Sequence, residues 1–217
     1  ARRMNALSGL TILDIGCGPG RQTLVLARET GGRVTAVDTH QPFLNQLRDR
    51  ADKAGMAQRL TVLKRPMDAL RLPEGAFDLI WSEGAIYIMG FPQGLAAWKK
   101  HLRPGGKLAV SECTWLRPDP PAELGNFWQA GYPAMRTVEG NLALCREAGY
   151  RVLSHFVLPE ADWLAYQAPL EERVKRLRDK YHGDLAAQKA LDEETREFDI
   201  VRRYAGWFGY VFYLLQK

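Results

Sequence analysis

The chain has 217 residues, a formal net charge of +5 and three cysteines, a length that suits one α/β domain with additional segments and a substantial core. No run of about 18 apolar residues predicts a membrane span, residues 1–5 are not followed by a signal-type apolar run, and the cysteines lie too far apart for a disulfide framework or a zinc site. We therefore expect a soluble, cytoplasmic protein with a single domain over residues 1–217 and no bound metal.

The first predicted strand ends in a glycine-rich loop. Residues 12–20 read Ile-Leu-Asp-Ile-Gly-Cys-Gly-Pro-Gly, and glycines at such a place let the backbone approach a ligand where a β-carbon would intrude. A dinucleotide fingerprint needs Gly-x-Gly-x-x-Gly, whereas Arg21 stands where the third glycine should fall. The loop therefore predicts a ligand other than a dinucleotide or, alternatively, a tight strand-to-helix turn without a ligand.

A second predicted strand, residues 34–37, ends in Asp38. This acid follows Gly16 by about twenty positions, the separation expected for a ribose-binding carboxylate in a βαβ unit. The alternative is a cap on the helix that begins near Pro42, and both roles can coexist.

Three further strands follow, at residues 60–63, 77–82 and 108–111, and the last is preceded by the turn Leu-Arg-Pro-Gly-Gly-Lys at 102–107. Strand and helix segments alternate up to Glu112. This alternation predicts parallel strands with right-handed crossovers and ligands at their carboxyl ends.

In this order, the segments resemble the motifs of class I S-adenosylmethionine-dependent methyltransferases, in a style similar to bacterial small-molecule enzymes such as the quinone and sterol C-methyltransferases. The resemblance implies an α/β fold with a doubly wound, seven-stranded, mostly parallel, Rossmann-like sheet. Its last strand is then antiparallel and lies between the fifth and the sixth.

The resemblance also implies S-adenosylmethionine as the cofactor. It assigns cofactor contacts to Asp14, Gly16, Cys17, Gly18, Gly20, Asp38, Met67, Asp68 and Ser82. Asp38 is expected to bind the ribose and Asp68 the adenine amino group, with Met67 against the ring. Arg65 and Pro66 stand where many family members have Gly-Asp, and the alternative for Asp68 is a solvated loop acid.

The rest of the chain predicts a helix at 137–148 ended by Gly149, a sixth strand at 150–158 and a terminal strand at 207–215. Two segments, about 114–136 and 160–205, interrupt the sheet pattern. The second contains an apolar helical stripe with supporting i, i+4 ion pairs. The stripe consists of Leu170, Val174, Leu177 and Tyr181. The pairs are Glu171 with Lys175 and Glu172 with Arg176.

The first of these segments is rich in aromatic residues, namely Trp115, Phe127, Trp128 and Tyr132. Such side chains suit a helical lid over a small organic substrate. Alternatively, they only anchor the segment to the sheet.

Methyl transfer from a sulfonium is an in-line displacement, in which the protein mainly holds the nucleophile near the methyl group and excludes water. If the acceptor must lose a proton, Glu83 after the fourth strand is the first candidate base, and His155 on the sixth strand is the second. Tyr87, Glu112 and Trp163 are expected to line the acceptor pocket. The alternatives are that Glu83 only orients a loop and that His155 is a packed or surface histidine.

The fourth strand is followed by Ser-Glu-Gly-Ala at 82–85, not by the Asn-Pro-Pro-Tyr or Asp-Pro-Pro-Tyr of many enzymes that methylate planar nitrogens. We therefore expect a methyltransferase with a small-molecule acceptor. The excess of basic residues in 1–112 leaves an RNA methyltransferase as an alternative, or only a solvated surface. A non-catalytic S-adenosylmethionine-binding module is the other alternative.

Overall fold

The computed structural model describes residues 9–217, except for the side chains of residues 160 and 163–166. The strands are β1 (Thr11–Ile15), β2 (Arg33–Asp38), β3 (Leu60–Lys64), β4 (Phe77–Ser82), β5 (Leu102–Trp115), β6 (Arg136–Thr137), β7 (Arg151–Val157) and β8 (Phe208–Gln216). The helices are α2 (Arg21–Thr30), α3 (Gln41–Lys53), α4 (Phe91–Lys99), α5 (Ala122–Gly131), α6 (Val138–Glu147), α7 (Glu160–Lys180) and α8 (Leu185–Arg203), with short 3₁₀ helices η1 (Ala57–Arg59) and η2 (Ile86–Ile88).

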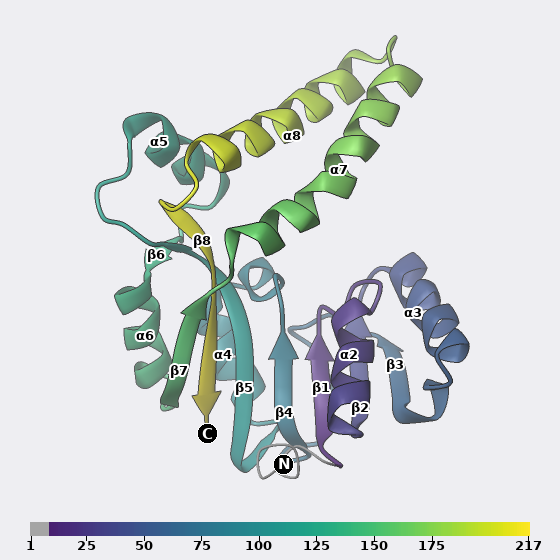
Figure 1. Ribbon diagram of the computed structural model, residues 1–217. Coiled ribbons are helices and arrows are strands. Elements are labelled where there is room, and N and C mark those ends of the chain that lie inside the picture. The colour runs from purple at the N-terminus through teal and green to yellow at the C-terminus, as the bar shows by residue number, and fades with distance from the viewer. Residues whose placement is uncertain (1–8) are drawn as a thin grey trace. The chain divides into compact units, whose positions relative to one another are not determined.

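The strands form one sheet in the order β3-β2-β1-β4-β5-β8-β7 (Figure 1). The pairs from β3 to β5 are parallel, and β8 runs antiparallel between β5 and β7. This arrangement confirms the predicted doubly wound sheet and the place of its last strand. The eighth strand, the two-residue β6 beside the end of β5, was not predicted.

The helices cover both faces of the sheet. Apolar residues of α2, Leu26 and Ala27, pack against Ile12 of β1 and Val34 of β2. On the opposite face lie α4 and α6 (Figure 1), and both contact Tyr213 of β8, through the ring of Phe91 in α4 and a 3.1 Å hydrogen bond from Asn141 in α6. The strand order reverses between β1 and β4, so the crevice at the carboxyl ends of these strands is where a doubly wound sheet binds ligands.

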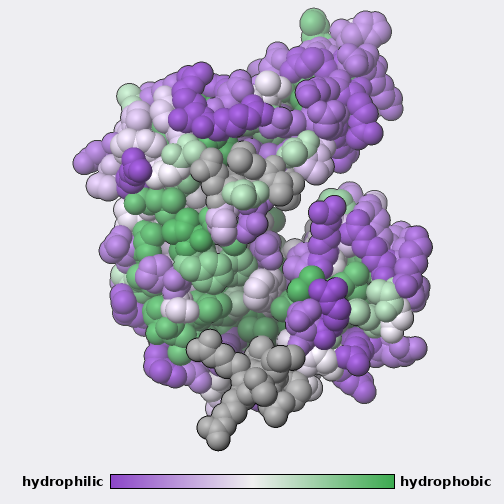
Figure 2. All heavy atoms as spheres, in the orientation of Figure 1, coloured by the Kyte–Doolittle hydropathy of each residue, from purple (hydrophilic) through white to green (hydrophobic). Residues whose placement is uncertain are grey.

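Aromatic rings lie in a row on the face of the sheet that α2 shares. Trp81 of β4 lies 5.0 Å from Phe212 of β8 between ring centroids, and Phe212 stacks on Phe156 of β7 at 5.4 Å. Figure 2 shows hydrophobic residues gathered over this half of the sheet. These rings connect β4, β8 and β7 by apolar contacts on one face of the sheet, although β5 separates β4 from β8.

Three local features differ from the sequence-based prediction or refine it. The predicted turn at 102–107 lies inside β5, where the left-handed Gly105 (φ 73°) and a register shift opposite residues 77–79 make an irregular strand start. The connection between β3 and β4 contains no helix, so the predicted alternation of strand and helix fails there. The predicted end of α6 is confirmed, because Gly149 has a φ of 76° and donates to the carbonyl of Arg146.

The chain divides into two compact units. Among the described residues, unit 1 comprises residues 9–112, 139–156 and 211–217, and unit 2 comprises residues 113–138 and 157–210. Unit 2 therefore combines both segments that interrupt the sheet pattern. No helix among the described residues is long and apolar enough to cross a membrane.

Unit 2 has a hydrophobic core of its own. Its buried members are Cys113, Leu124, Met135, Ile200, Val201 and Phe208, and Trp115, Phe127, Trp128, Tyr132, Tyr204, Trp207 and Tyr210 pack around them. The four aromatic residues singled out in the sequence thus pack around this core of unit 2. The predicted i, i+4 pairs are replaced by a 2.7 Å pair between Glu172 and Lys175 and by a pair between Glu171 and Arg202 of α8.

Candidate functional site

The glycine-rich loop after β1 is tied to the end of β2 by backbone hydrogen bonds. The N–H groups of Gly16 and Cys17 donate to the carbonyl oxygen of Val37, at 2.9 and 3.1 Å. The N–H of Gly18 donates to Asp38 Oδ2 at 2.9 Å. These hydrogen bonds connect the loop to the end of β2 and help to fix its conformation.

The three glycines have different structural roles. A β-carbon on Gly16 would lie 2.4 Å from Cβ of Ala85, and one on Gly20 would lie 2.1 Å from Cδ1 of Leu47 in α3. A β-carbon on Gly18 would have no heavy atom within 4 Å. All three have positive φ, from 52° to 81°. The space above the loop that the sequence predicted for a ligand is thus open at Gly18, whereas protein atoms occupy it at the other two glycines.

Asp38 accepts hydrogen bonds through both carboxylate oxygens, from the N–H of Gly18 and, at 2.8 Å, from the N–H of His40. Because His40 is the N-cap of α3 and makes no side-chain cap hydrogen bond, the predicted capping role of Asp38 is not formed. The carboxylate fixes the residue before the helix instead. Each oxygen has further lone pairs, which ligand hydroxyl groups can use.

Asp14 is fully buried at the end of β1. Its Oδ2 accepts a 2.6 Å hydrogen bond from the Thr23 hydroxyl of α2, and its Oδ1 has no hydrogen-bond partner among the described residues. Burial raises the pKa of this carboxyl to about 7; the Thr23 hydrogen bond opposes the shift, and the charges of Glu83 and Asp38 add to it. A buried carboxyl of this kind suits a cationic partner.

Cys17 contributes its backbone to the loop, and its side chain lies in the core. The thiol packs in an apolar cluster with Ala36, Leu44 and Leu47, and burial raises its pKa above the usual range. Its carbonyl oxygen accepts a 3.0 Å hydrogen bond from the Gln22 side chain. A direct contact of the Cys17 side chain with a ligand is therefore excluded in this conformation.

The end of β4 brings Ser82 and Glu83 beside the loop. Ser82 is fully buried, and its hydroxyl has no hydrogen-bond partner among the described residues. Glu83 is exposed and accepts a 3.2 Å hydrogen bond from the Trp81 indole. The next residue, Gly84, donates its N–H to the buried Ser111 hydroxyl of β5 at 2.8 Å. Ser111 thus fixes the turn that carries Glu83, a role that its place in an apolar strand did not signal.

Met67 and Asp68 lie on the helix-free connection after β3. Met67 is half-buried, and its Cε would lie 3.9 Å from a β-carbon on Gly16. Asp68 is exposed. The Arg65 guanidinium donates to the carbonyls of Leu70 and Arg71, so it closes this connection upon itself. Arg65, one of the two residues that depart from the Gly-Asp pattern, therefore has a structural role in this connection.

The structure does not bring all of the remaining candidates together. Tyr87 is exposed in η2, close along the chain to Glu83, and Glu112 is buried near the end of β5. His155 is exposed on the edge strand β7 and stacks on the Tyr213 ring. Four strand spacings separate β7 from β1, or roughly 19 Å. His155 is therefore not brought to the glycine loop.

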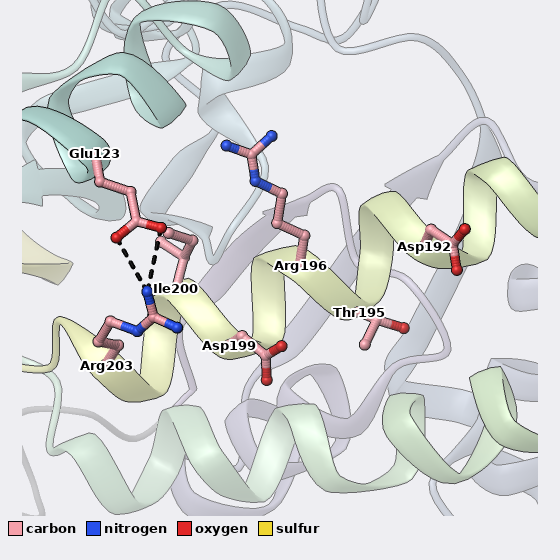
Figure 3. A pocket seen from close by; sticks show the side chains of 7 residues that line it. All are labelled: Glu123, Asp192, Thr195, Arg196, Asp199, Ile200 and Arg203. Atoms are coloured by element: carbon pink, nitrogen blue, oxygen red, sulfur yellow. Dashed lines mark hydrogen bonds and ion pairs between the residues drawn. The ribbon is translucent and has the colours of Figure 1, made fainter.

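Trp163 belongs to α7, but its side chain lies outside the described residues. In unit 2, the structure contains a cavity of about 240 Å³ between α5 and α8 (Figure 3), lined by Glu123, Asp192, Thr195, Arg196, Asp199, Ile200 and Arg203. In this cavity, Glu123 is paired with Arg203 at 3.0 Å. None of the predicted site residues lines it.

The carboxyl ends of β1, β2 and β4 thus gather carboxyl groups at Asp14, Asp38 and Glu83, close enough for Glu83 and Asp38 to affect the pKa of Asp14. In the described part of the chain, no group of three or more potential ligands suited to a metal ion occurs. The open loop at Gly18 and the unpartnered buried oxygens of Asp14 and Ser82 leave hydrogen-bonding capacity for a ligand. A ligand with a cationic group and hydroxyl groups would use this hydrogen-bonding capacity.

Residues 12–106 match a family model described as a methyltransferase domain. Over 113 residues, the chain is 34% identical to methyltransferase GfsG of Streptomyces halstedii, and the match covers 51% of this chain and 40% of that protein. Over 186 residues, it is 24% identical to sterol 24-C-methyltransferase ERG6A of Gibberella zeae, covering 81% of this chain and 48% of that protein. The chain therefore spans less than half the length of these curated relatives.

The fold is similar to the crystal structure of an S-adenosylmethionine-dependent methyltransferase from Geobacter sulfurreducens in complex with S-adenosyl-L-homocysteine. The TM-score is 0.83 at 23% identity, and the match covers 99% of this chain and 88% of that one. At this identity the likeness establishes the fold.

Proposed function

Because the chain belongs to the class I S-adenosylmethionine-dependent methyltransferases in its motifs, its methyltransferase domain and its fold, we propose that it transfers a methyl group from S-adenosylmethionine to a small organic acceptor. The observation that carries this proposal is the buried Asp14, with one carboxyl oxygen unpartnered among the described residues, beside the open glycine loop. Such a carboxyl is costly unless a cationic ligand uses it.

The cofactor residues are assigned by their chemistry. Asp14 is proposed to accept from the ligand ammonium group and Asp38 from the ribose hydroxyls, while Asp68 accepts from the adenine amino group with Met67 against the ring. Gly18 leaves room for the ligand above the loop. When bound, S-adenosylmethionine supplies an electrophilic methyl group on a sulfonium, and the protein supplies position and a dry site.

Glu83 is the proposed general base for an acceptor that carries a proton on its nucleophilic atom. Its carboxylate is oriented by the Trp81 indole, and the Ser111 hydroxyl holds the following residue. Tyr87 and Glu112 are proposed to line the acceptor pocket. His155 is not proposed as a base, because its edge-strand position separates it from the glycine loop.

Labelled methyl transfer tests this proposal directly. The protein is incubated with S-adenosylmethionine that carries an isotopic label on its methyl group and with fractions of a metabolite extract, and a labelled small molecule is expected. Calorimetry with S-adenosylhomocysteine measures cofactor binding separately. Binding without a labelled product in any fraction would favour the non-catalytic module, and label found only in RNA would favour the RNA alternative.

The substitution Glu83→Gln tests the base assignment. We expect turnover to fall by 10²-fold or more, the contribution typical of a general base, while the affinity for S-adenosylhomocysteine changes by less than about threefold. Asp49→Asn, on the exposed side of α3, is the control for loss of one acidic charge. Unchanged turnover in the Gln variant would remove Glu83 as the base.

A further inference from the structure

The connection between β3 and β4 carries Met67 and Asp68 but contains no helix of its own. Such a segment needs support from neighbouring elements to hold a recognition residue in place. Its second half is tied by backbone hydrogen bonds to the residues after α4, since the N–H groups of Gly75 and Ala76 donate to the carbonyls of Lys100 and His101 at 2.9 and 3.0 Å. In the first half, the Arg65 side chain donates to the carbonyls of Leu70 and Arg71, and α4 supplies a further support.

That support is Trp98, near the end of α4. Its side chain is fully buried, and its indole Nε1 donates to the carbonyl oxygen of Met67 at 3.0 Å. This is a contact between residues 31 positions apart in the sequence. A buried indole N–H requires an acceptor, and the acceptor here is the backbone of the residue before Asp68.

Helix α4 also supports the turn after β4. A β-carbon on Gly94 would lie 2.5 Å from Cγ1 of Ile86, so the helix and η2 are in close contact there. Ile86 follows Ala85, which packs against Gly16, and the Met67 side chain approaches the same glycine. The two loops that meet at Gly16 are therefore both supported by α4, one of them through a single side-chain hydrogen bond.

We propose that Trp98 is a positioning residue for nucleoside recognition: its indole N–H fixes the Met67 backbone so that Asp68 meets the adenine amino group. The inference rests on the proposed function, because it assumes an adenosyl ligand at the glycine loop. A Trp98 that served only the core would affect stability, but it would not affect discrimination between ligands that differ in the amino group alone.

The experiment compares two ligands by calorimetry. One is S-adenosylhomocysteine, and the other is its counterpart with purine in place of adenine, which lacks only the 6-amino group. We expect wild type to prefer the adenine ligand. In Trp98→Phe, that preference is expected to shrink by roughly three- to tenfold, the effect of weakening about one hydrogen bond. A second variant carries 3-benzothienylalanine at residue 98, in which sulfur replaces the indole N–H at nearly constant shape, and the same shrinkage is expected.

Tyr150→Phe is the matched control. The Tyr150 hydroxyl donates a buried hydrogen bond to the Leu95 carbonyl of the same helix at 3.0 Å, so its loss affects α4 without affecting the connection. Its ligand preference should equal that of wild type. A wild-type preference that survives in both Trp98 variants, or that is lost equally in Tyr150→Phe, would overturn the positioning role.

Two results in wild type itself separate this inference from the proposed function. Binding of S-adenosylhomocysteine without preference for its amino group would overturn the inference and leave the proposed function intact. Absence of binding by either ligand would overturn both.

Discussion

The buried carboxyl of Asp14 destabilises the folded protein when it is ionised, and the same carboxyl is the proposed partner of the ligand ammonium group. Burial raises its pKa from 3.8 to about 7, so the carboxyl of the folded protein keeps its proton up to about pH 7. Since the folded pKa exceeds the unfolded value, this group's contribution to stability is full below pH 4 and is lost as the pH rises through about 7. A bound ammonium group reverses the preference, because it favours the carboxylate.

The affinity for S-adenosylhomocysteine should therefore rise between pH 6 and pH 8. Over this range Asp14 loses its proton, so that ligand binding no longer has to supply the free energy of deprotonation. Asp14→Asn should bind roughly tenfold or more weakly at pH 8, the effect of a charged hydrogen bond, and should show a flat profile. Thr23→Val removes the hydrogen bond that lowers the pKa and should move the midpoint to higher pH. Calorimetry across this range measures all three, and a flat wild-type profile would contradict the assignment.

Alanine substitutions at Gly18 and Gly20 should affect ligand binding and protein stability to different extents. Gly20→Ala places an alanine in the left-handed backbone conformation and makes its β-carbon clash with Leu47. We therefore expect it to lower the free energy of unfolding by about 2–4 kcal/mol. Gly18→Ala has open space around it and should cost only about 1 kcal/mol, yet it should weaken ligand binding at least tenfold. Denaturant unfolding and calorimetry on both variants make the comparison; equal effects on binding would mean that Gly18 does not face the ligand.

At the scale of elements, the Ser111 side chain connects β5 to the turn that follows β4 by a hydrogen bond. Ser111→Ala removes the acceptor for the Gly84 N–H, which should cost about 1 kcal/mol of stability because water can replace part of the lost hydrogen bond. We expect turnover to fall about tenfold through misplacement of Glu83, with cofactor affinity nearly unchanged. Ser154→Ala, at an exposed position of β7, is the control. A parallel loss of cofactor affinity would show a general loosening of the site instead.

The sequence predicted those elements whose signals are local. The apolar runs at 12–15 and 77–82 and the glycine at 149 act through their own backbone or through neighbours in the sequence, and the structure confirms them. The missed features depend on distant partners. The helix-free connection after β3 is held by Trp98 and by the residues after α4, and no periodicity within residues 65–76 reports on such partners.

The site shows the same division. The positions of Asp14 and Asp38 at strand ends followed from the βαβ pattern, and the structure brings these two carboxyls and Glu83 close together. The separation of His155 from the glycine loop follows from the place of the last strand between the fifth and the sixth, which the resemblance already implied; the choice of His155 as a candidate base did not take that strand order into account. The roles of Thr23 and Ser111, in contrast, could not be predicted, because they arise from side chains meeting across elements.

For the whole molecule, the division into two units changes how the lid prediction must be tested. The segments 114–136 and 160–205 were predicted as lid or insertion segments, and their role as a cover over the acceptor stays a prediction. Deleting residues 160–205 would remove Ile200 and Val201 from the core that also holds Leu124 and Met135. Such a deletion would therefore unfold the partner segment, and a milder change is required.

Leu124→Ala supplies that change. Leu124 is fully buried in α5, and its truncation should cost about 2–5 kcal/mol through lost burial and a residual cavity. Because the core of unit 2 is separate, amide hydrogen exchange should accelerate in residues 113–138 and 157–210, while residues 11–15 and 33–38 stay protected. Affinity for S-adenosylhomocysteine should stay within about twofold of wild type, since every proposed cofactor residue lies in unit 1. Leu185→Ala, at a position 88% exposed, should change neither readout. Equal loss of protection in β1 and β2 would mean that the two units unfold as one cooperative structure.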